Sequence, residues 1–215
     1  SAVAQGSLKD GTKGISPLAT LGRNDKLNVL DKWILAKLQI LVQEVTNGME
    51  NYDMSKSSRP ILDFITELSQ WYVRRSRDRF KTQGVRNKEQ GESEAEVATA
   101  VLREVLLTLS KVMAPFTPFI AEKIYLGITQ GKEKESVHLE KWPSFAKATA
   151  GEAQEDVKIL QQMSMVRKVV EMGLSLRAEN SLKVRQPLNK FSIFNFQFSI
   201  SDEMLEIIAE ELNVK

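Results

Sequence analysis

Apolar residues recur at steps of three and four over most of the chain, which is the spacing of one helix face. This pattern predicts a first helix from Leu30 to Met49. A second helix is expected to begin near Pro60, because proline is tolerated in a first helical turn, with Ser57 or Ser58 as its N-cap. It continues through an arginine-rich stretch. A start at Asp53 would instead place Pro60 inside the helix and should kink it.

The same spacing predicts three further helices, at about 92–114, 117–128 and 153–179. After them the period changes, because Phe and Ile alternate with polar residues over 194–200, as in a half-buried strand. Ser201 then follows as the expected N-cap of a last short helix.

These elements predict a mainly α fold, an antiparallel helical bundle followed by a small truncated α+β segment. We divide the chain into a flexible lead or linker at 1–25, a bundle at 26–188 and the truncated start of a C-terminal module at 189–215. One strand and one helix cannot fold independently, so the last segment is expected to be part of a larger domain.

Composition excludes several classes of protein. The chain has 215 residues, 42% of them apolar, and no cysteine, so it holds no disulfide and no thiolate metal site. A single histidine, His138, excludes multi-histidine metal centres. No apolar run is long enough to span a membrane, and no segment reads as a signal peptide. A cytoplasmic location and no membrane partner are therefore expected.

The net charge of +2 conceals one concentrated basic segment at 71–88. Its seven cations face a single acid, Asp78, so the segment carries +6 and the rest of the chain −4. Guanidinium groups match phosphate oxygens, and three aromatic side chains lie among them, so this segment is a candidate RNA-binding surface. The alternative is a solvated helix face paired with acids elsewhere. The candidate residues are Arg74, Arg75, Arg77, Arg79, Lys81, Arg86 and Lys88.

A second basic corner lies at 177–188, where the fifth helix ends before Pro187. Lys183 and Arg185 could face RNA or another domain there. A cation near a helix C-terminus is also stabilising in itself, so a purely structural role is the alternative.

We assign no catalytic residue and no metal ligand. His138 is expected to form structural hydrogen bonds, and the acidic group at 92–96 is expected to make a solvated helix start. The members of that group are Glu92, Glu94 and Glu96. The three tryptophans, Trp33, Trp71 and Trp142, are expected to anchor the core or its edge.

Several segments in order resemble the anticodon-binding helical bundle of class I aminoacyl-tRNA synthetases, and the isoleucyl-tRNA synthetases in particular. They are L-D-K-W-I-L-A-K-L at 30–38, N-Y-D at 51–53, L-S-Q-W-Y-V-R-R-S-R-D-R-F at 68–80, M-A-P-F-T-P-F-I-A-E-K-I-Y at 113–125, S-V-H-L-E-K-W-P at 136–143, V-R-Q-P-L at 184–188 and E-L-N-V-K at 211–215. The resemblance covers about residues 26–215.

The chain departs from that family at several points. The H-I-G-H signature, an editing domain and the zinc-binding cysteines are absent, and Lys81 stands where the family often has Trp. The string at 53–57 reads D-M-S-K-S rather than the family's ATP-binding K-M-S-K-S, and it falls at a helix start, where Ser55 and Ser57 are expected to cap. Residues 144–156 resemble an inserted loop.

The resemblance implies a fragment of a ligase that grips tRNA on its anticodon side and is inactive alone. The parent enzyme would charge isoleucine onto tRNA(Ile) using ATP with Mg, whereas this chain would bind no cofactor. The implied partners are tRNA and the parent's catalytic domain, with the chain a monomer. Part of the arginine cluster could face that domain instead of RNA. The alternatives are a valyl- or leucyl-type bundle, or a helical module whose basic face binds an acidic protein.

Overall fold

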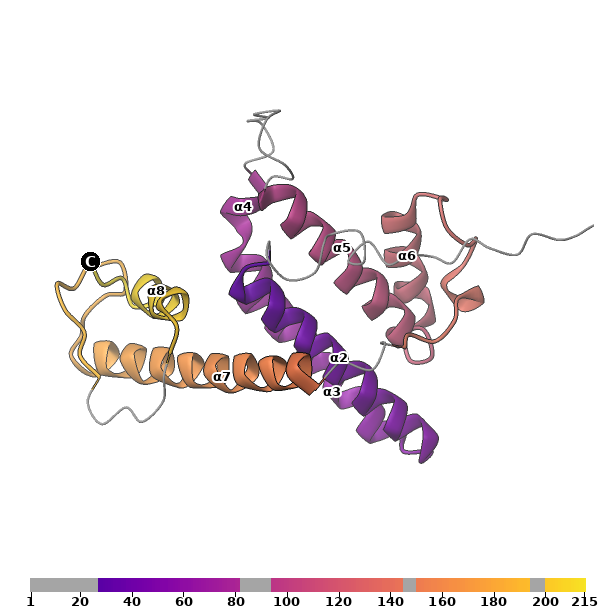
Figure 1. The fold of residues 1–215 in the computed structure, drawn as a ribbon, viewed down its shortest axis with the longest axis horizontal. Coiled ribbons are helices and arrows are strands. Elements are labelled where there is room, and N and C mark those ends of the chain that lie inside the picture. The colour runs from indigo at the N-terminus through magenta and orange to yellow at the C-terminus, as the bar shows by residue number, and fades with distance from the viewer. Residues whose placement is uncertain (1–26, 82–93, 145–149, 194–199) are drawn as a thin grey trace, which may run out of the picture.

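The computed structural model describes residues 27–81, 94–144, 150–193 and 200–215, and these residues are mainly α-helical (Figure 1). The mainly α prediction is therefore confirmed. The strand predicted over 194–200 falls almost wholly outside the described residues, and the lead at 1–25 lies wholly outside them.

Two antiparallel helices, α2 (Val29–Glu50) and α3 (Met54–Glu67), form a hairpin. Helix α2 begins with a capping box, in which Asn28 Oδ1 accepts from the Asp31 amide at 2.8 Å and the Asp31 carboxylate accepts from the Asn28 amide. The hairpin turn is tight, since the Asp53 amide donates to the Gly48 carbonyl at 2.9 Å.

The expected start of the second helix is wrong. Asp53, not Ser57 or Ser58, is the N-cap, and its carboxylate accepts from the Lys56 amide at 2.9 Å. Pro60 consequently lies inside α3. Ser57 is buried in the first turn, where its hydroxyl donates to the Asp53 carbonyl at 2.7 Å, so the helix starts earlier than the proline suggests.

The second helix does not remain regular after α3. Leu68–Val73 forms a π-helical segment (η1), and the chain then continues into the short helix α4 (Arg77–Lys81). A π-helical segment changes the direction in which the side chains before and after it point, and such segments are frequent at functional sites. Arg74 and Arg75 therefore lie at the junction between η1 and α4, whereas Arg77 and Arg79 lie in α4 itself.

Helices α5 (Glu94–Met113) and α6 (Pro118–Thr129) form a second pair, and α5 packs beside α2. Thr117 and Pro118 begin α6 at its N-cap and first position, although the Thr117 side chain makes no cap bond. Beyond α6 a short 3-10 turn, η3 (Val137–Leu139), packs on α6 and α5 and so returns the chain toward the bundle.

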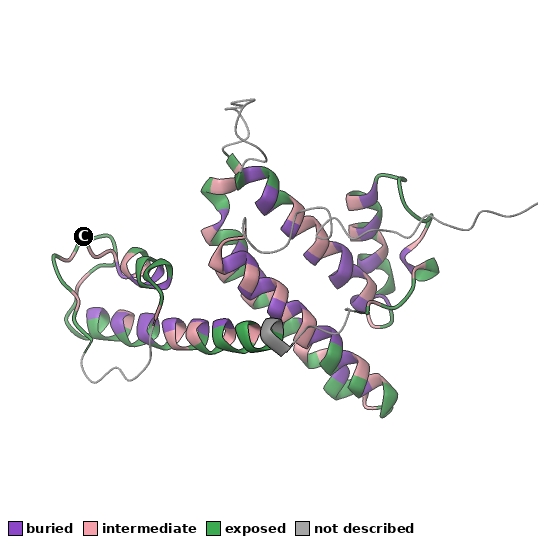
Figure 2. Ribbon diagram, viewed as in Figure 1, coloured by how far each residue is buried: buried purple, intermediate pink, exposed green. Residues whose placement is uncertain are grey.

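The long helix α7 (Ala150–Glu179) packs against α2 and then extends beyond the bundle (Figure 1). Helix α8 (Asp202–Glu211) lies on the extended part, and buried positions of α7 lie on the side turned toward it (Figure 2). Ser201 occupies the N-cap of α8 as predicted, without a side-chain cap bond. The chain end pairs with the turn after α7 through a parallel bridge between Leu188 and Val214.

One hydrophobic core joins these helices. Trp33 and Tyr72 are among its largest fully buried side chains, and Met204 and Leu212 bring α8 and its C-terminal end into the same cluster.

The three tryptophans have the expected core and core-edge positions. Trp33 is buried, and Trp71 is half-buried against the core. Trp142 lies at the edge, where its Nε1 donates to the Thr46 hydroxyl at 2.8 Å. This hydrogen bond attaches the segment after η3 to α2.

Candidate RNA-binding surface

The first group of predicted cations surrounds a buried carboxylate at the start of α2. Asp31 is fully buried, and Arg79 from α4 contacts it with two hydrogen bonds, of 3.0 and 2.8 Å. Tyr72 from η1 donates its hydroxyl to the same carboxylate at 2.8 Å. The arrangement joins three elements through one charge that would be costly to bury unpaired.

The ionisation of these groups reflects that burial. Burial raises the pKa of the Tyr72 phenol, and the negative charge of Asp31 and its hydrogen bond raise it further. Burial by itself would lower the pKa of Arg79, but the hydrogen bonds and charge of Asp31 outweigh it, so the pKa is raised. Arg79 is therefore a permanent structural cation.

The second group binds the far end of the chain. Glu211 of α8 accepts from Arg74 at 2.5 Å and from Arg75 at 2.7 Å, and Glu210 forms a further hydrogen bond with Arg75. Burial alone would raise the pKa of Glu211, but its hydrogen bonds to both arginines lower it overall. Residues more than 130 positions apart are thus joined, a pairing that no local pattern indicates.

The other described cations of the segment, Arg77 and Lys81, face solvent, and so does much of the Arg74 side chain. Arg77 is exposed, the Lys81 side chain is 67% exposed while pairing with Asp78 at 2.8 Å, and the Arg74 side chain is 56% exposed despite its contact with Glu211. Arg86 and Lys88 lie outside the described residues. Among the described members of the cluster, Arg74, Arg77 and Lys81 are therefore the most available to a phosphate backbone.

The corner after α7 contains a cation with a structural role. Arg177 is 3% exposed, and its Nη2 donates to the carbonyls of Lys183 and Val184 at 2.9 and 3.0 Å and also to that of Gln186. It holds the turn in place, while Lys183 and Arg185 remain exposed. The two predicted RNA-binding residues of this corner are thus presented on a braced turn.

The other candidate residues have ordinary structural positions. His138 is exposed in η3, where its backbone amide donates to the Ser136 hydroxyl. Glu94 and Glu96 lie in the first turn of α5, as expected, and Glu92 lies outside the described residues.

The D-M-S-K-S string at 53–57 forms the N-cap and first turn of α3. Its expected position at a helix start is therefore confirmed, but the expected capping by Ser55 and Ser57 is wrong, because the Asp53 side chain caps the helix. Aspartate accepts the free amide hydrogens of a first turn at least as well as serine does.

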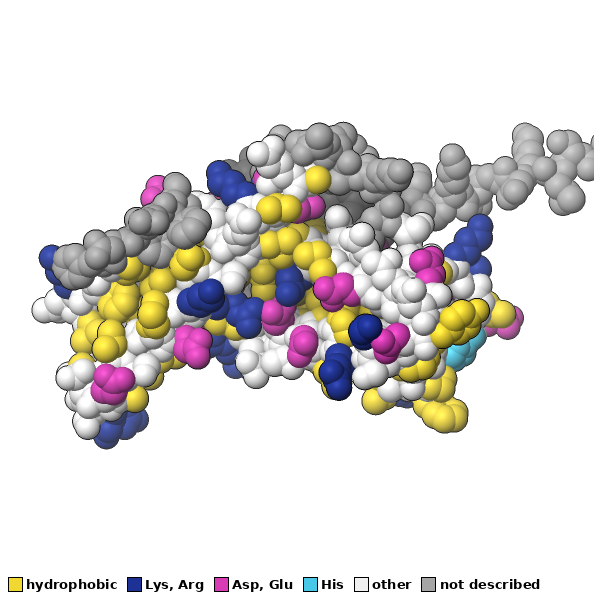
Figure 3. Space-filling model, turned by 90° about the horizontal axis from the view of Figure 1, so that it is seen from below, with side chains coloured by type: hydrophobic (Ala, Val, Ile, Leu, Met, Phe, Trp, Pro, Cys, Tyr) yellow, Lys and Arg dark blue, Asp and Glu magenta, His cyan; other side chains and the backbone are white. Residues whose placement is uncertain are grey.

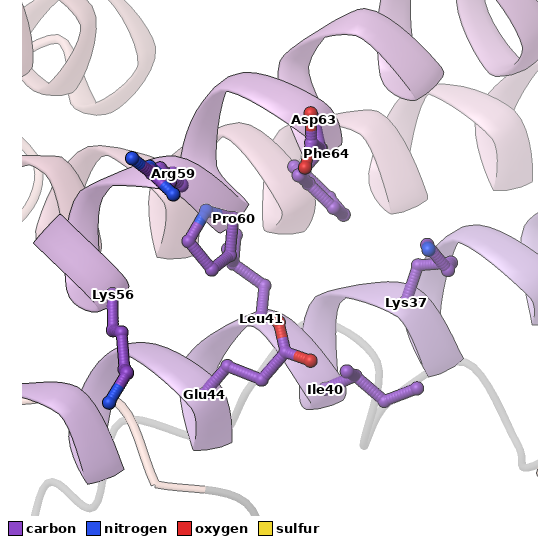
Figure 4. Close-up of a pocket in the computed structure, with 9 residues that line it drawn as sticks. All are labelled: Lys37, Ile40, Leu41, Glu44, Lys56, Arg59, Pro60, Asp63 and Phe64. Atoms are coloured by element: carbon purple, nitrogen blue, oxygen red, sulfur yellow. The ribbon is translucent and has the colours of Figure 1, made fainter.

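A groove of about 410 Å³ lies between α2 and α3, and no sequence pattern predicted it. Apolar side chains and charged ones of both signs line it, as Figure 4 shows. The lining residues are Lys37, Ile40, Leu41, Glu44, Lys56, Arg59, Pro60, Asp63 and Phe64. Helical spacing alone places Lys37, Ile40, Leu41 and Glu44 on one face of α2. The opposite wall of the groove comes from α3, and only the packing of α3 against α2 brings it there.

Charges of opposite sign are also mixed over the molecular face in Figure 3, where Lys and Arg lie close to Asp and Glu. In the described parts of the chain, no group of three or more His, Cys, Asp or Glu residues is arranged to hold a metal ion. None of the described helices is both long and apolar enough to cross a lipid bilayer.

Comparison with known proteins agrees with this architecture. Residues 31–192 match the family model described as the anticodon-binding domain of tRNA ligase. The chain is 38% identical over 192 residues to the isoleucine–tRNA ligase of Clostridium acetobutylicum, 40% over 191 residues to that of Streptomyces coelicolor and 39% over 199 residues to that of Thermus thermophilus. These matches cover 86–89% of the chain but only 17–18% of each relative, so the chain spans about one sixth of their length.

Proposed function

Because the chain belongs to the family of anticodon-binding domains of tRNA ligases, we propose that it binds tRNA on the anticodon side. The family match over residues 31–192 is the observation that carries this proposal. The exposed cations supply the chemistry, since guanidinium and ammonium groups can neutralise backbone phosphates.

The proposed contact uses the exposed members of the basic segment rather than all of it. Arg74, Arg77 and Lys81 extend from the η1–α4 region, and the braced turn after α7 adds Lys183 and Arg185. Phosphate contacts of this kind fix the position of the RNA without reading its sequence.

The other predicted cations are not part of this exposed set. Arg75 and Arg79 support the surface from beneath, through their ion pairs with Glu211 and Asp31. Arg86 and Lys88 are proposed as RNA contacts only because they belong to the basic segment of the sequence. This division makes Arg77 and Lys81 the proper targets for substitution, because neither pairs with another helix among the described residues, whereas Arg74 also contacts Glu211 of α8.

The finer proposal concerns the parent protein. The similarity to isoleucine–tRNA ligases supports a role in positioning tRNA(Ile) for aminoacylation, with the chemistry performed by a catalytic domain of the same parent in the cytoplasm. That domain, not this chain, would use ATP with Mg. The chain is proposed to act as a monomer. A bundle of the valyl or leucyl type is the competing assignment.

Titration of the chain with tRNA(Ile) transcript at two salt concentrations tests the proposal. Binding should weaken steeply with salt, and replacing Arg77 and Lys81 by Ala should lower the salt slope by up to about two phosphate contacts. A Lys123→Ala variant is the control, since this exposed lysine lies on α6, outside the cluster. No binding at low salt would overturn the proposal, and equal binding of tRNA(Val) would overturn the isoleucine assignment.

A further inference from the structure

We infer that the α2–α3 groove is a base-reading site, which accepts one unstacked nucleobase of a single-stranded RNA loop. The inference rests on the proposed function, because it identifies where RNA sequence, as opposed to RNA backbone, would be recognised. It concerns residues that the basic segment does not include, on a different pair of helices.

The apolar part of the groove suits a flat ring. Ile40 and Pro60 are half-buried and keep accessible apolar surface in the groove, above the buried Leu41 and Phe64. Pro60 presents its ring from α3 toward α2 (Figure 4). Because proline has no amide hydrogen, Pro60 cannot donate the helical hydrogen bond to the Lys56 carbonyl, and its ring is the apolar surface that α3 contributes here. The groove is open to solvent, and its volume of about 410 Å³ admits one base that stays partly exposed.

The charged side chains of the groove supply both donors and acceptors. Glu44 projects from α2 into the space between the helices, Arg59 and Lys56 lie at one end, and Asp63 and Lys37 lie toward the other (Figure 4). The two carboxylates would repel a phosphate. A base edge, in contrast, presents amino hydrogens to carboxylates and carbonyl or ring-nitrogen acceptors to a guanidinium.

Three of these charged groups are not used by the described fold. Lys56 pairs with Asp53 at 3.1 Å and Lys37 with Glu67 at 2.9 Å. Glu44, Arg59 and Asp63 are exposed and make no ion pair or side-chain hydrogen bond with the described part of the chain. One cationic donor and two acceptors can therefore turn to a base without breaking a contact among the described residues.

An exposed aromatic ring lies at the tip of the same hairpin. Tyr52 is 93% exposed and adopts a φ of +56°, a left-handed conformation that costs a non-glycine residue of order 1 kcal/mol. Its turn is held by a hydrogen bond from the Tyr52 amide to the Met49 carbonyl at 3.0 Å. A neighbouring base could stack on this ring, because every base has a π face. A ring at the tip and a groove along the same hairpin together favour RNA as the occupant.

Binding of a stem-loop RNA that carries the tRNA(Ile) anticodon loop tests this assignment. Glu44→Gln and Arg59→Ala should each weaken binding by roughly tenfold, as expected for loss of base-edge hydrogen bonds. The matched controls, Glu50→Gln at the exposed end of α2 and Lys123→Ala on α6, should bind like the unaltered chain.

Single-base changes in the loop supply the specificity readout. At one loop position the effect of the base change and that of the groove variant should not add, because both remove the same contact. Arg77→Ala should instead weaken binding of all loops equally, as expected for a phosphate contact. Full additivity at every loop position would contradict base reading in the groove.

Photocrosslinking with 4-thiouridine placed at each loop position gives an independent readout. Crosslinks to peptides covering 37–64 are expected from at least one position. Crosslinks confined to 74–81 or 183–185, together with unchanged affinity of the Glu44→Gln and Arg59→Ala variants, would overturn the groove while leaving the proposed function intact. Absence of RNA binding by the unaltered chain would overturn both.

Discussion

Individual side chains divide the basic segment into structural and available cations. Arg79 compensates a carboxylate that is fully buried, and Arg75, whose side chain is 10% exposed, is held by Glu211. Arg77 and Lys81 face outward from the same short helix as Arg79. Neighbouring residues of identical charge therefore have different roles, and substitutions should separate these roles by their effect on stability.

Arg79→Ala should destabilise the fold by about 3 kcal/mol or more, because it leaves Asp31 buried without its cation. Arg77→Ala, on the exposed side of α4, is the matched control and should change the free energy of unfolding by less than about 0.5 kcal/mol. Urea denaturation of both variants measures the difference. Equal stability of the two would contradict a structural role for Arg79.

Tyr72 makes the same network sensitive to alkaline pH. Its pKa is raised above the ordinary 10.0 by burial and by Asp31, so the folded state retains the phenolic proton more tightly than the unfolded state does. The resulting stabilisation is complete below about pH 10 and is lost as the pH rises through the raised pKa. The melting temperature should therefore fall above about pH 10, and Tyr72→Phe should reduce that fall. An alkaline profile that is the same in the variant would show that other groups cause it.

Between elements, the α2–α3 hairpin depends on a close approach at Gly48. A Cβ at this position would lie 2.4 Å from the Ser57 hydroxyl oxygen and 3.0 Å from the Ser57 backbone nitrogen. Because the second contact is with backbone, a side-chain rotation cannot relieve it. Close packing of α2 against α3 therefore requires a glycine at position 48, near the end of α2.

Gly48→Ala should consequently destabilise the chain by about 1–3 kcal/mol, through forced separation of the hairpin. Gly127→Ala in α6 is the matched control, since nothing lies within 4 Å of the added Cβ, and it should stabilise the helix by about 0.5–1 kcal/mol. Thermal denaturation of the two variants should show melting temperatures shifted in opposite directions. Shifts of the same sign would contradict the packing argument.

Across the molecule, the ion pairs of Glu210 and Glu211 tie the end of the chain to the junction of η1 and α4. Arg74 and Arg75 are the partners, and the apolar side of α8 joins the core that α7 also shares. The pKa of Glu211 is lowered overall, so the stabilisation from this group is present above its ordinary value of 4.5 and is lost as the pH falls through the lowered pKa.

A Glu210→Gln and Glu211→Gln double variant should therefore accelerate amide hydrogen exchange in α8 at neutral pH, with little change in α2. Glu206→Gln, an exposed carboxylate on the same helix, is the control and should leave exchange unchanged. In the unaltered chain, exchange in α8 relative to α2 should increase below about pH 4.5. Uniform exchange rates across the three proteins would show that apolar packing alone holds α8.

Local pattern predicts the long helices and the family resemblance, but not the division of the second helix into α3, η1 and α4. Apolar spacing places the long helices within a few residues of their observed bounds, because each must bury one stripe whatever its neighbours are. The proline rule misplaces the start of α3, since the Asp53 cap and the tight turn before it outweigh the cost of Pro60 inside the helix. The basic segment was also evident, because charge density is visible along the chain.

Tertiary packing, in contrast, determines which of the basic side chains form ion pairs and which remain exposed. The partners of Arg75 and Arg79, Glu211 and Asp31, are distant in sequence, and the groove needs one wall from each of two helices. Such contacts depend on how helices pack, and the cost of burying an unpaired charge selects the pairs. Helix periodicity is predictable from the sequence because it depends on residues that are close together along the chain. Ion pairs and grooves are not, because they form between residues that are distant along the chain and that only the fold brings together.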